Sequence, residues 1–272
     1  MSIIQDILTY EFLRNAFIAG ILVSVLTSLF STVVVLRKIE FIGDGAAHAA
    51  FGGLALGFLI GAGSEIMAMV TAIIFALTIS YFSRREKISE NSMIGMLLPL
   101  SMAVGVILLS FVRGYTPDVM GYLFGNILLV GKNDIWLLLG FTVAAVLFFC
   151  FFGREILYYS YDETMARHCG VNVNFIHYAI LIGLSLSIVA SVKIAGIILV
   201  TAFIVTPAAT AKLIVKTYRS MILFSLLLSV FAMIFGLGIS YLFDLPPGPV
   251  VVLILFLEFL LTYVFAMKTK NE

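Results

Sequence analysis

The sequence predicts an all-α protein: a polytopic bundle of about eight to nine transmembrane helices. Of its 272 residues, 62% are hydrophobic and only 11% are charged, and the mean hydropathy is +1.17. Soluble domains carry about 25% charged residues, so most of this surface is expected to face lipid rather than water. Apolar runs fill nearly the whole chain, so we expect a single transmembrane domain over residues 1–272.

Each predicted span is an apolar run close to the roughly 20 helical residues that cross a bilayer. The segments 45–61 and 177–193 are short, and one or both are also consistent with partial spans packed inside the bundle. A further short run, 119–131, is consistent with a half-helix or re-entrant piece. The nine predicted spans are 12–36, 45–61, 65–83, 92–112, 134–152, 177–193, 195–214, 219–243 and 249–267.

The distribution of lysine and arginine predicts the orientation of these spans. With the C-terminus inside, alternating the spans puts 12 of the 16 basic residues on the cytoplasmic side and 4 on the outer side. Positive residues concentrate in cytoplasmic loops. We therefore expect the N-terminus outside and the C-terminus inside, with nine spans favoured over eight.

Composition and motifs also exclude several functions. A net charge of +1 gives no electrostatic signal for nucleic acid. No GxxxxGK[ST] loop occurs, and the chain leaves no room for an ATPase domain. Cys150 and Cys169 are not in a CxxC pair, so neither a disulfide nor a cysteine metal site is expected.

Asp44 and His48 are the most informative polar residues, because they occur within an apolar segment. Side chains four residues apart lie on one face of a helix, and ionisable groups inside a membrane are costly enough to be functional candidates. A carboxylate and a neutral imidazole suit divalent zinc, manganese or iron. Two ligands hold an ion poorly, but two copies facing across a two-fold axis would double them. Alternatively, Asp44 caps the helix and His48 is a hydrogen-bonded packing residue.

Small residues mark a second face of the same predicted helix. A small residue every fourth position permits close approach of another helix. This stripe lies beside the one that holds Asp44, His48 and Gly52, so Gly52 is a candidate to line an ion pathway. The small residues are Gly45, Ala49, Gly53, Gly57 and Gly61.

Residues 153–176 form the longest polar segment between spans and are expected in the cytoplasm. Residues 164–169 are predicted to form a short helix, and Gly170 suits its end. A short helix lying across a loop suits the docking of a partner protein. An ordinary loop is the alternative.

Five stretches of sequence, in order along nearly the whole chain, resemble the zinc and manganese permeases of ABC importers, the ZnuB-type family. GDGAAHAAFGGLALGF resembles the GDxxxHxxxxG pattern that follows the first span of that family. The other four are YLFGN (122–126), YDETMARHCGV (161–171), VKIAGIILVTAFIVTPAATAKL (192–213) and LPPGP (245–249).

The resemblance implies the permease subunit of an ATP-driven importer in the inner or plasma membrane. Its cargo would be Zn²⁺ or Mn²⁺, with iron as a third candidate, and no organic cofactor or catalytic residue is expected. Asp44 and His48 match the metal-binding pathway residues, while Asp162, Ala166 and Gly170 match the helix that couples to the ATPase. The implied partners are a second permease copy, cytoplasmic ATP-binding subunits and an extracytoplasmic metal-binding protein.

Other polar residues within or near spans are weaker candidates. Asn126 and Thr206, which precedes Pro207, are candidates for the pathway. Glu258 lies near the middle of the last span, either as a pathway or proton site or as a protonated, hydrogen-bonded acid. His177 is expected at the membrane interface. A proton-coupled secondary transporter with Glu258 and His48 as relays is the alternative function, although no clear inverted repeat supports it.

Overall fold

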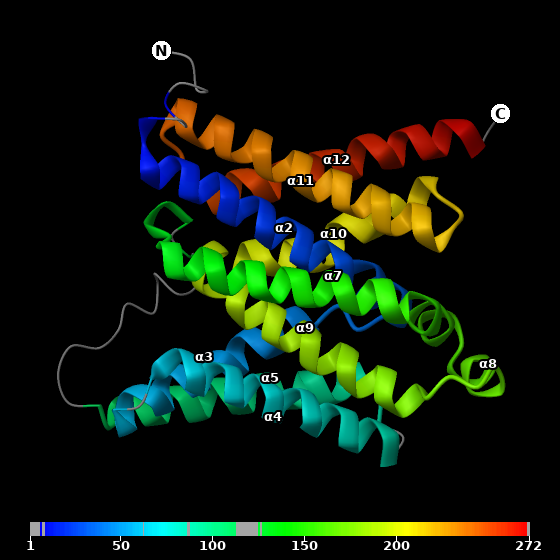
Figure 1. Cartoon of the computed structure of the whole chain (residues 1–272), viewed down its shortest axis with the longest axis horizontal. Coiled ribbons are helices and arrows are strands. Elements are labelled where there is room, and N and C mark those ends of the chain that lie inside the picture. Colours follow the sequence, from blue (N-terminus) through cyan, green and yellow to red (C-terminus); the bar gives the residue numbers. More distant parts are fainter. Residues whose placement is uncertain are drawn as a thin grey trace. The chain divides into compact units, whose positions relative to one another are not determined.

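The computed structural model describes residues 6, 9–61, 63–85, 88–112, 125 and 127–270, which are helical almost throughout. A short 3₁₀ turn, η1, covers Ile127–Leu129. The long helices follow one another along the chain (Figure 1). They are α2 (Glu11–Arg37), α3 (Ile42–Ile60), α4 (Ser64–Arg85), α5 (Glu90–Ser110), α7 (Lys132–Tyr161), α9 (Val173–Ala195), α10 (Ile197–Ile214), α11 (Tyr218–Phe243) and α12 (Pro247–Lys270), with the short α8 (Glu163–His168) between α7 and α9. The connections from α9 to α10, from α10 to α11 and from α11 to α12 are short.

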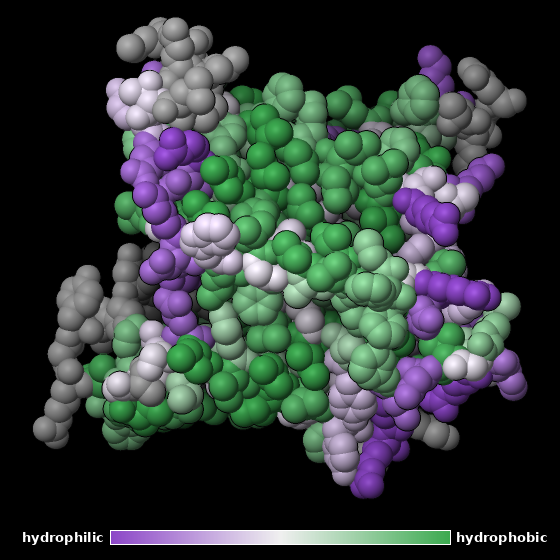
Figure 2. Space-filling model, in the orientation of Figure 1, coloured by the Kyte–Doolittle hydropathy of each residue, from purple (hydrophilic) through white to green (hydrophobic). Residues whose placement is uncertain are grey.

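Among the described residues, nine helices are long and apolar enough to cross a membrane. They coincide with the nine predicted spans, and α8 is the short exception. Figure 2 shows hydrophobic side chains over the middles of the helices and hydrophilic side chains gathered near their ends. The predicted fold class, a polytopic all-α membrane protein, is therefore confirmed. The orientation of the termini stays a prediction.

The two segments predicted to be short are full-length helices. α3 begins at Ile42 and has 19 residues, and α9 begins at Val173 and has 23. At 1.5 Å per residue they extend about 28 and 34 Å, against a hydrocarbon core of about 30 Å. Their polar first turns, which include Asp44 and Asn174, hid these beginnings from a hydropathy argument. The predicted half-helix at 119–131 lies largely outside the described residues.

Local side-chain chemistry explains several helix ends. The Ser89 hydroxyl accepts a hydrogen bond from the Ser92 amide at the start of α5, and Thr217 caps α11 in the same way. Such caps satisfy amides that have no partner inside the helix. Gly196 has a φ of 80°, a backbone conformation that favours glycine. It separates α9 from α10, so one long apolar stretch becomes two helices.

The chain forms two compact units. Unit 1 comprises Met1–Leu36, Met120–Gly153 and Ala190–Glu272, and unit 2 comprises Arg37–Val119 and Arg154–Val189. In unit 1, α10 packs against α11 and α12. Unit 2 contains α3 with Asp44 and His48, and it also contains α8. Both predicted functional segments therefore belong to one compact unit.

Within unit 2, α3 packs against both α4 and α5. A Cβ atom on Gly53 would lie 2.5 Å from the Met67 carbonyl oxygen and 2.7 Å from the Ala68 Cα atom. A Cβ atom on Gly57 would lie 2.6 Å from the Ser64 Cα atom. These distances are shorter than van der Waals contact, so the backbones of α3 and α4 touch. The predicted close approach along the small-residue stripe is confirmed, with α4 as the partner helix.

Candidate functional site

Asp44 and His48 lie on the face of α3 that other helices leave uncovered in the single chain. Both side chains are partly exposed, whereas residues 45–47, 49 and 50 are buried. Farther along the same face, Phe51 is partly exposed and Phe58 is 43% exposed. At 100° per residue these four positions form one stripe, here called the open face of α3.

The two structural alternatives for Asp44 and His48 are not observed. The N-cap residue of α3 is Phe41, and no side chain caps this helix end. Asp44 is the third residue of the helix, where a carboxylate complements the helix dipole without capping. Neither Asp44 nor His48 forms a hydrogen bond with another described residue. Both side chains therefore retain donor atoms for a ligand.

One chain contributes too few of the usual metal ligands at the open face. No group of three or more His, Cys, Asp and Glu side chains among the described residues could hold a metal ion. Protein zinc sites use three or four protein ligands, and manganese prefers six-fold coordination. An ion bound by Asp44 and His48 would therefore need further ligands from water or from another chain.

The structure places Gly52 against α5 rather than on the open face. A Cβ atom there would lie 3.2 Å from the Ser101 carbonyl oxygen. The neighbouring Gly45 is enclosed by α4 and α5, because its Cβ would lie 2.5 Å from the Phe75 ring and 2.9 Å from Ile94. Gly52 and Gly45 thus position the helix that bears the two ligands. A pathway role for Gly52 stays a prediction.

The remaining pathway candidates lie outside unit 2, which holds Asp44 and His48. Asn126 lies outside the described residues. Thr206 is partly buried on α10, and its carbonyl accepts a hydrogen bond from the Thr210 hydroxyl. Glu258 is partly buried on α12, and its Oε1 atom has no hydrogen-bond partner among the described residues. Thr206 and Glu258 belong to unit 1, and their pathway roles stay predictions.

The predicted short helix in the 153–176 segment is present as α8. The Asp162 carboxylate accepts hydrogen bonds from the amides of Thr164 and Met165 at 2.7 and 3.0 Å, so it caps the helix. Ala166 is fully buried, and Gly170 ends the helix with a φ of 79°. The three residues singled out by resemblance thus start, anchor and end α8. Its remaining surface is largely exposed.

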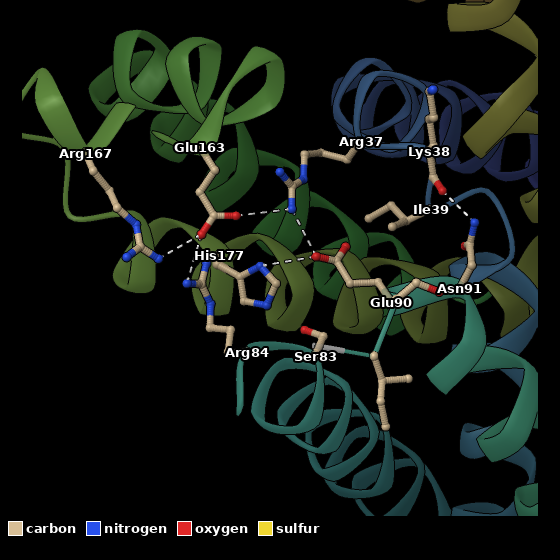
Figure 3. Close-up of a pocket in the computed structure, with 12 residues that line it drawn as sticks. Arg37, Lys38, Ile39, Ser83, Arg84, Glu90, Asn91, Glu163, Arg167 and His177 are labelled. Carbon is tan, nitrogen blue, oxygen red and sulfur yellow. Dashed lines mark hydrogen bonds and ion pairs between the residues drawn. The ribbon is translucent and has the colours of Figure 1, made fainter. Parts of the chain in front are cut away.

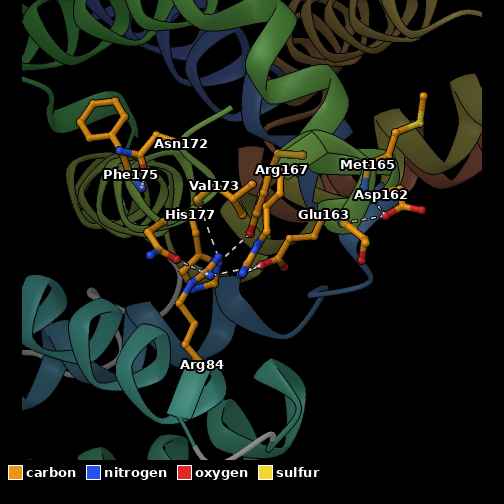
Figure 4. A network of polar contacts seen from close by, with 12 residues as sticks. Arg84, Asp162, Glu163, Met165, Arg167, Asn172, Val173, Phe175 and His177 are labelled. Carbon is orange, nitrogen blue, oxygen red and sulfur yellow. Dashed lines mark hydrogen bonds and ion pairs between the residues drawn. The ribbon is translucent and has the colours of Figure 1, made fainter. Parts of the chain in front are cut away.

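A single carboxylate ties α8 to two other helix ends. Glu163 Oε1 lies 3.1 Å from both Arg84 Nη1 and Arg167 Nη2 (Figure 4). Glu163 Oε2 lies 3.6 Å from Nη2 of Arg37, the last residue of α2. Partial burial raises the pKa of the Glu163 carboxyl, but the surrounding arginines outweigh this effect and hold the pKa below its ordinary 4.5. The ionised form of Glu163 is therefore favoured.

A polar pocket of about 530 Å³ lies beside this carboxylate (Figure 3). Glu90 Oε1, on α5, accepts a hydrogen bond from Arg37 at 3.0 Å and lies 3.7 Å from His177 Nδ1. His177, predicted to lie at the membrane interface, is buried within the protein: it is 1% exposed and its Nδ1 lies 2.7 Å from the Tyr159 hydroxyl. The guanidinium of Arg37 between the carboxylates makes this pocket unsuitable for a cation.

From the sequence, the arginines around the pocket indicated only the orientation of the membrane spans. The sequence did contain a signal for ion pairing, because Arg37 and Arg84 each lie at the end of one span while Glu90 begins another. Such charges at neighbouring helix ends can pair. The sequence contained no indication that Glu163 would join the same group.

Comparison with known proteins identifies the family of this chain. Residues 9–266 match the ABC 3 transport family. The chain is 43% identical over 260 residues to a Thermotoga maritima protein named "Probable metal transport system membrane protein", covering 96% of this chain and 92% of that protein. It is 34% identical to the manganese transport system membrane protein MntC of Halalkalibacterium halodurans, covering 97% and 90% of the two chains.

A solved structure shares the fold. It is that of PsaBC from Streptococcus pneumoniae in complex with Fab, with a TM-score of 0.84 and 33% identity, covering 96% of this chain and 94% of the other. The likeness extends over almost the full length of both chains. On the family match and these relatives, the chain belongs to the ABC 3 transport family.

Proposed function

We propose that this chain is the permease subunit of an ATP-driven importer for a divalent transition metal, with Mn²⁺ the first candidate cargo and Zn²⁺ the second. The single observation that carries the proposal is the open face of α3. It presents a carboxylate and an imidazole, four residues apart and both partly exposed, from a helix whose neighbouring positions 45–47, 49 and 50 are buried. The names of the manganese transport relatives support the choice of cargo.

A second copy of the chain completes the proposed site. Two α3 helices facing each other across a two-fold axis contribute two Asp44 carboxylates and two His48 imidazoles. Oxygen and nitrogen ligands of this kind suit manganese and zinc, with geometry and availability deciding between them. The two cysteines are exposed elsewhere, so we expect no thiolate at the site to favour a softer metal.

The energy source in this proposal is a pair of separate ATP-binding subunits in the cytoplasm. They dock on α8, whose largely exposed surface is available to a partner. An extracytoplasmic metal-binding protein delivers the ion to the outer side. The permease dimer spans the cell membrane with its C-termini inside, as the distribution of basic residues predicts.

The test measures Mn²⁺ uptake by the complete complex in cells that lack their own importer. Asp44→Ala and His48→Ala are each expected to reduce uptake to background while the complex still assembles, because each removes one ligand from both copies. Phe51→Leu is the matched control: it changes the same open face without touching a donor atom, and it is expected to retain uptake. Normal accumulation in both ligand variants would refute the site.

Reconstitution of the chain without its partners separates this proposal from proton-coupled secondary transport. A secondary transporter using His48 and Glu258 would move Mn²⁺ in liposomes that contain this chain alone and a proton gradient. The proposed importer requires the ATP-binding subunits and ATP. Uptake by the chain alone would therefore overturn the proposal, whatever the effect of the Asp44 variant.

A further inference from the structure

We propose that Glu163 is a positioning residue that transmits movement of α8 to the helix that bears Asp44 and His48. This inference rests on the proposed function and deepens it, since it assigns the contact through which ATP-driven motion reaches the metal site. Two structural connections, one through Arg37 and one through Arg84, lead from the Glu163 carboxylate to α3.

The first connection runs through Arg37 and the short segment before α3. Only residues 38–41 separate Arg37 from the start of α3. The Asn91 side chain, on α5, donates a hydrogen bond to the Lys38 carbonyl at 2.6 Å (Figure 3), and the Ile42 amide donates to the Ile39 carbonyl at 3.1 Å. A displacement of Arg37 therefore acts on the beginning of α3, near Asp44.

The second connection runs through α4. Arg84 lies at the end of this helix, and the backbone of α4 touches that of α3 at Gly53. The α4 side chain Phe75 encloses Gly45, the residue next to Asp44. Packed protein interiors transmit displacement because they contain few voids. A pull on Arg84 therefore also reaches the two ligands.

The charges make Glu163 difficult to replace within this group. The side chains of Arg37 and Arg84 are only 19% and 16% exposed, so their interactions with a carboxylate are less screened than surface pairs. Among the residues that the structure describes, Glu163 is the one carboxylate that forms an ion pair with Arg84. The substitution Glu163→Gln would keep the shape of the side chain but remove the charge that pairs with both arginines, leaving Glu90 on α5 as the ion-pair partner of Arg37.

Other contacts of α8 allow the variant protein to fold. The Asp162 cap and the buried Ala166 do not depend on Glu163. Arg84 also donates to the Asn174 side chain at 2.7 Å, so α4 stays attached to α9. Arg167 differs from Arg84 in one respect, because it belongs to α8 itself. Its 3.1 Å ion pair with Glu163 cannot transmit movement to another helix.

The experiment reconstitutes the complete complex in liposomes and measures Mn²⁺ ions imported per ATP hydrolysed. Glu163→Gln and Arg84→Gln are each expected to lower this ratio at least tenfold. Arg167→Gln is the matched control, since it removes an ion pair of equal length to the same carboxylate, and its ratio is expected to stay within twofold of wild type. A loss of folding alone reduces the amount of complex, but the surviving complexes keep their ratio.

Three results would overturn this inference. The first is a wild-type ratio in Glu163→Gln, and the second is an equal fall in Arg167→Gln. The third is failure of both Glu163→Gln and Arg84→Gln to assemble, which would assign the two residues to folding. If the wild-type complex itself imports no Mn²⁺, the proposed function fails instead, so the two failures are distinguishable.

Discussion

The contact between α3 and α4 can be tested by adding one methyl group. In Gly53→Ala, the new Cβ would lie 2.2 Å from Thr71 Oγ1, 2.5 Å from the Met67 carbonyl oxygen and 2.7 Å from the Ala68 Cα atom. The Thr71 side chain can rotate away, but the Met67 and Ala68 backbone atoms can move only if helix α4 moves. The matched control is Gly95→Ala on α5, where a Cβ atom would meet no heavy atom within 4 Å.

The geometry sets the size of the expected effect. Favourable carbon contacts lie at about 3.5 to 4.0 Å, so the two helices must separate by roughly 1 Å at this point. Overpacking of this kind costs about 1–3 kcal/mol, whereas alanine is favoured over glycine in a helix by about 1 kcal/mol. Both variants gain the helix preference of alanine over glycine, and only Gly53→Ala is overpacked. Their free energies of unfolding should therefore differ by about 1–3 kcal/mol, or roughly 5- to 150-fold in the unfolding equilibrium constant.

The assay is thermal unfolding of the purified complex in detergent, together with metal uptake in cells. Gly53→Ala is expected to unfold at a lower temperature than wild type and to import less metal, because the displaced helix carries Asp44 and His48. Gly95→Ala is expected to be at least as stable as wild type. Equal stability of the two variants would show that α3 and α4 are not in backbone contact at Gly53, and the reasoning would be wrong.

Two further predictions concern α8. Cys169, exposed beside α8, is expected to react with a membrane-impermeant maleimide only in inside-out vesicles and to be protected by the ATP-binding subunits, whereas Cys150, exposed on the membrane-spanning α7, should stay unlabelled. Labelling of Cys169 from outside would contradict the orientation. The pKa of Glu163 is lowered in the fold, so its attachment to Arg84 should be constant above about pH 5 and weaken only as the pH falls through that lowered value. A spin label on Cys169 should become more mobile in that acidic range, and Glu163→Gln should abolish this dependence. A change near neutral pH would exclude Glu163 as its cause.

The helices and their ends could be predicted from the sequence because the interactions that form them join residues close together in the chain. In lipid, a helix satisfies its backbone hydrogen bonds within one segment, so long apolar runs predicted all nine spans. The short helix in the 153–176 segment was equally visible, since Asp162 and Gly170 act on neighbouring backbone atoms. The beginnings of α3 and α9 were missed by three and four residues. Their first turns carry polar residues, Asp44 and Asn174, which lower the hydropathy at the start of each span.

The sequence by itself determined the membrane-spanning class, the spans and the pairing of Asp44 with His48 on one helical face. Only the tertiary structure decided that this face is the open one, that Gly53 meets α4, and that His177 is buried. It also decided that Glu163 binds an arginine 79 residues away. The physical reason is that hydropathy and helical period act between near neighbours. Contacts between helices depend instead on how their surfaces pack, and no single segment encodes that.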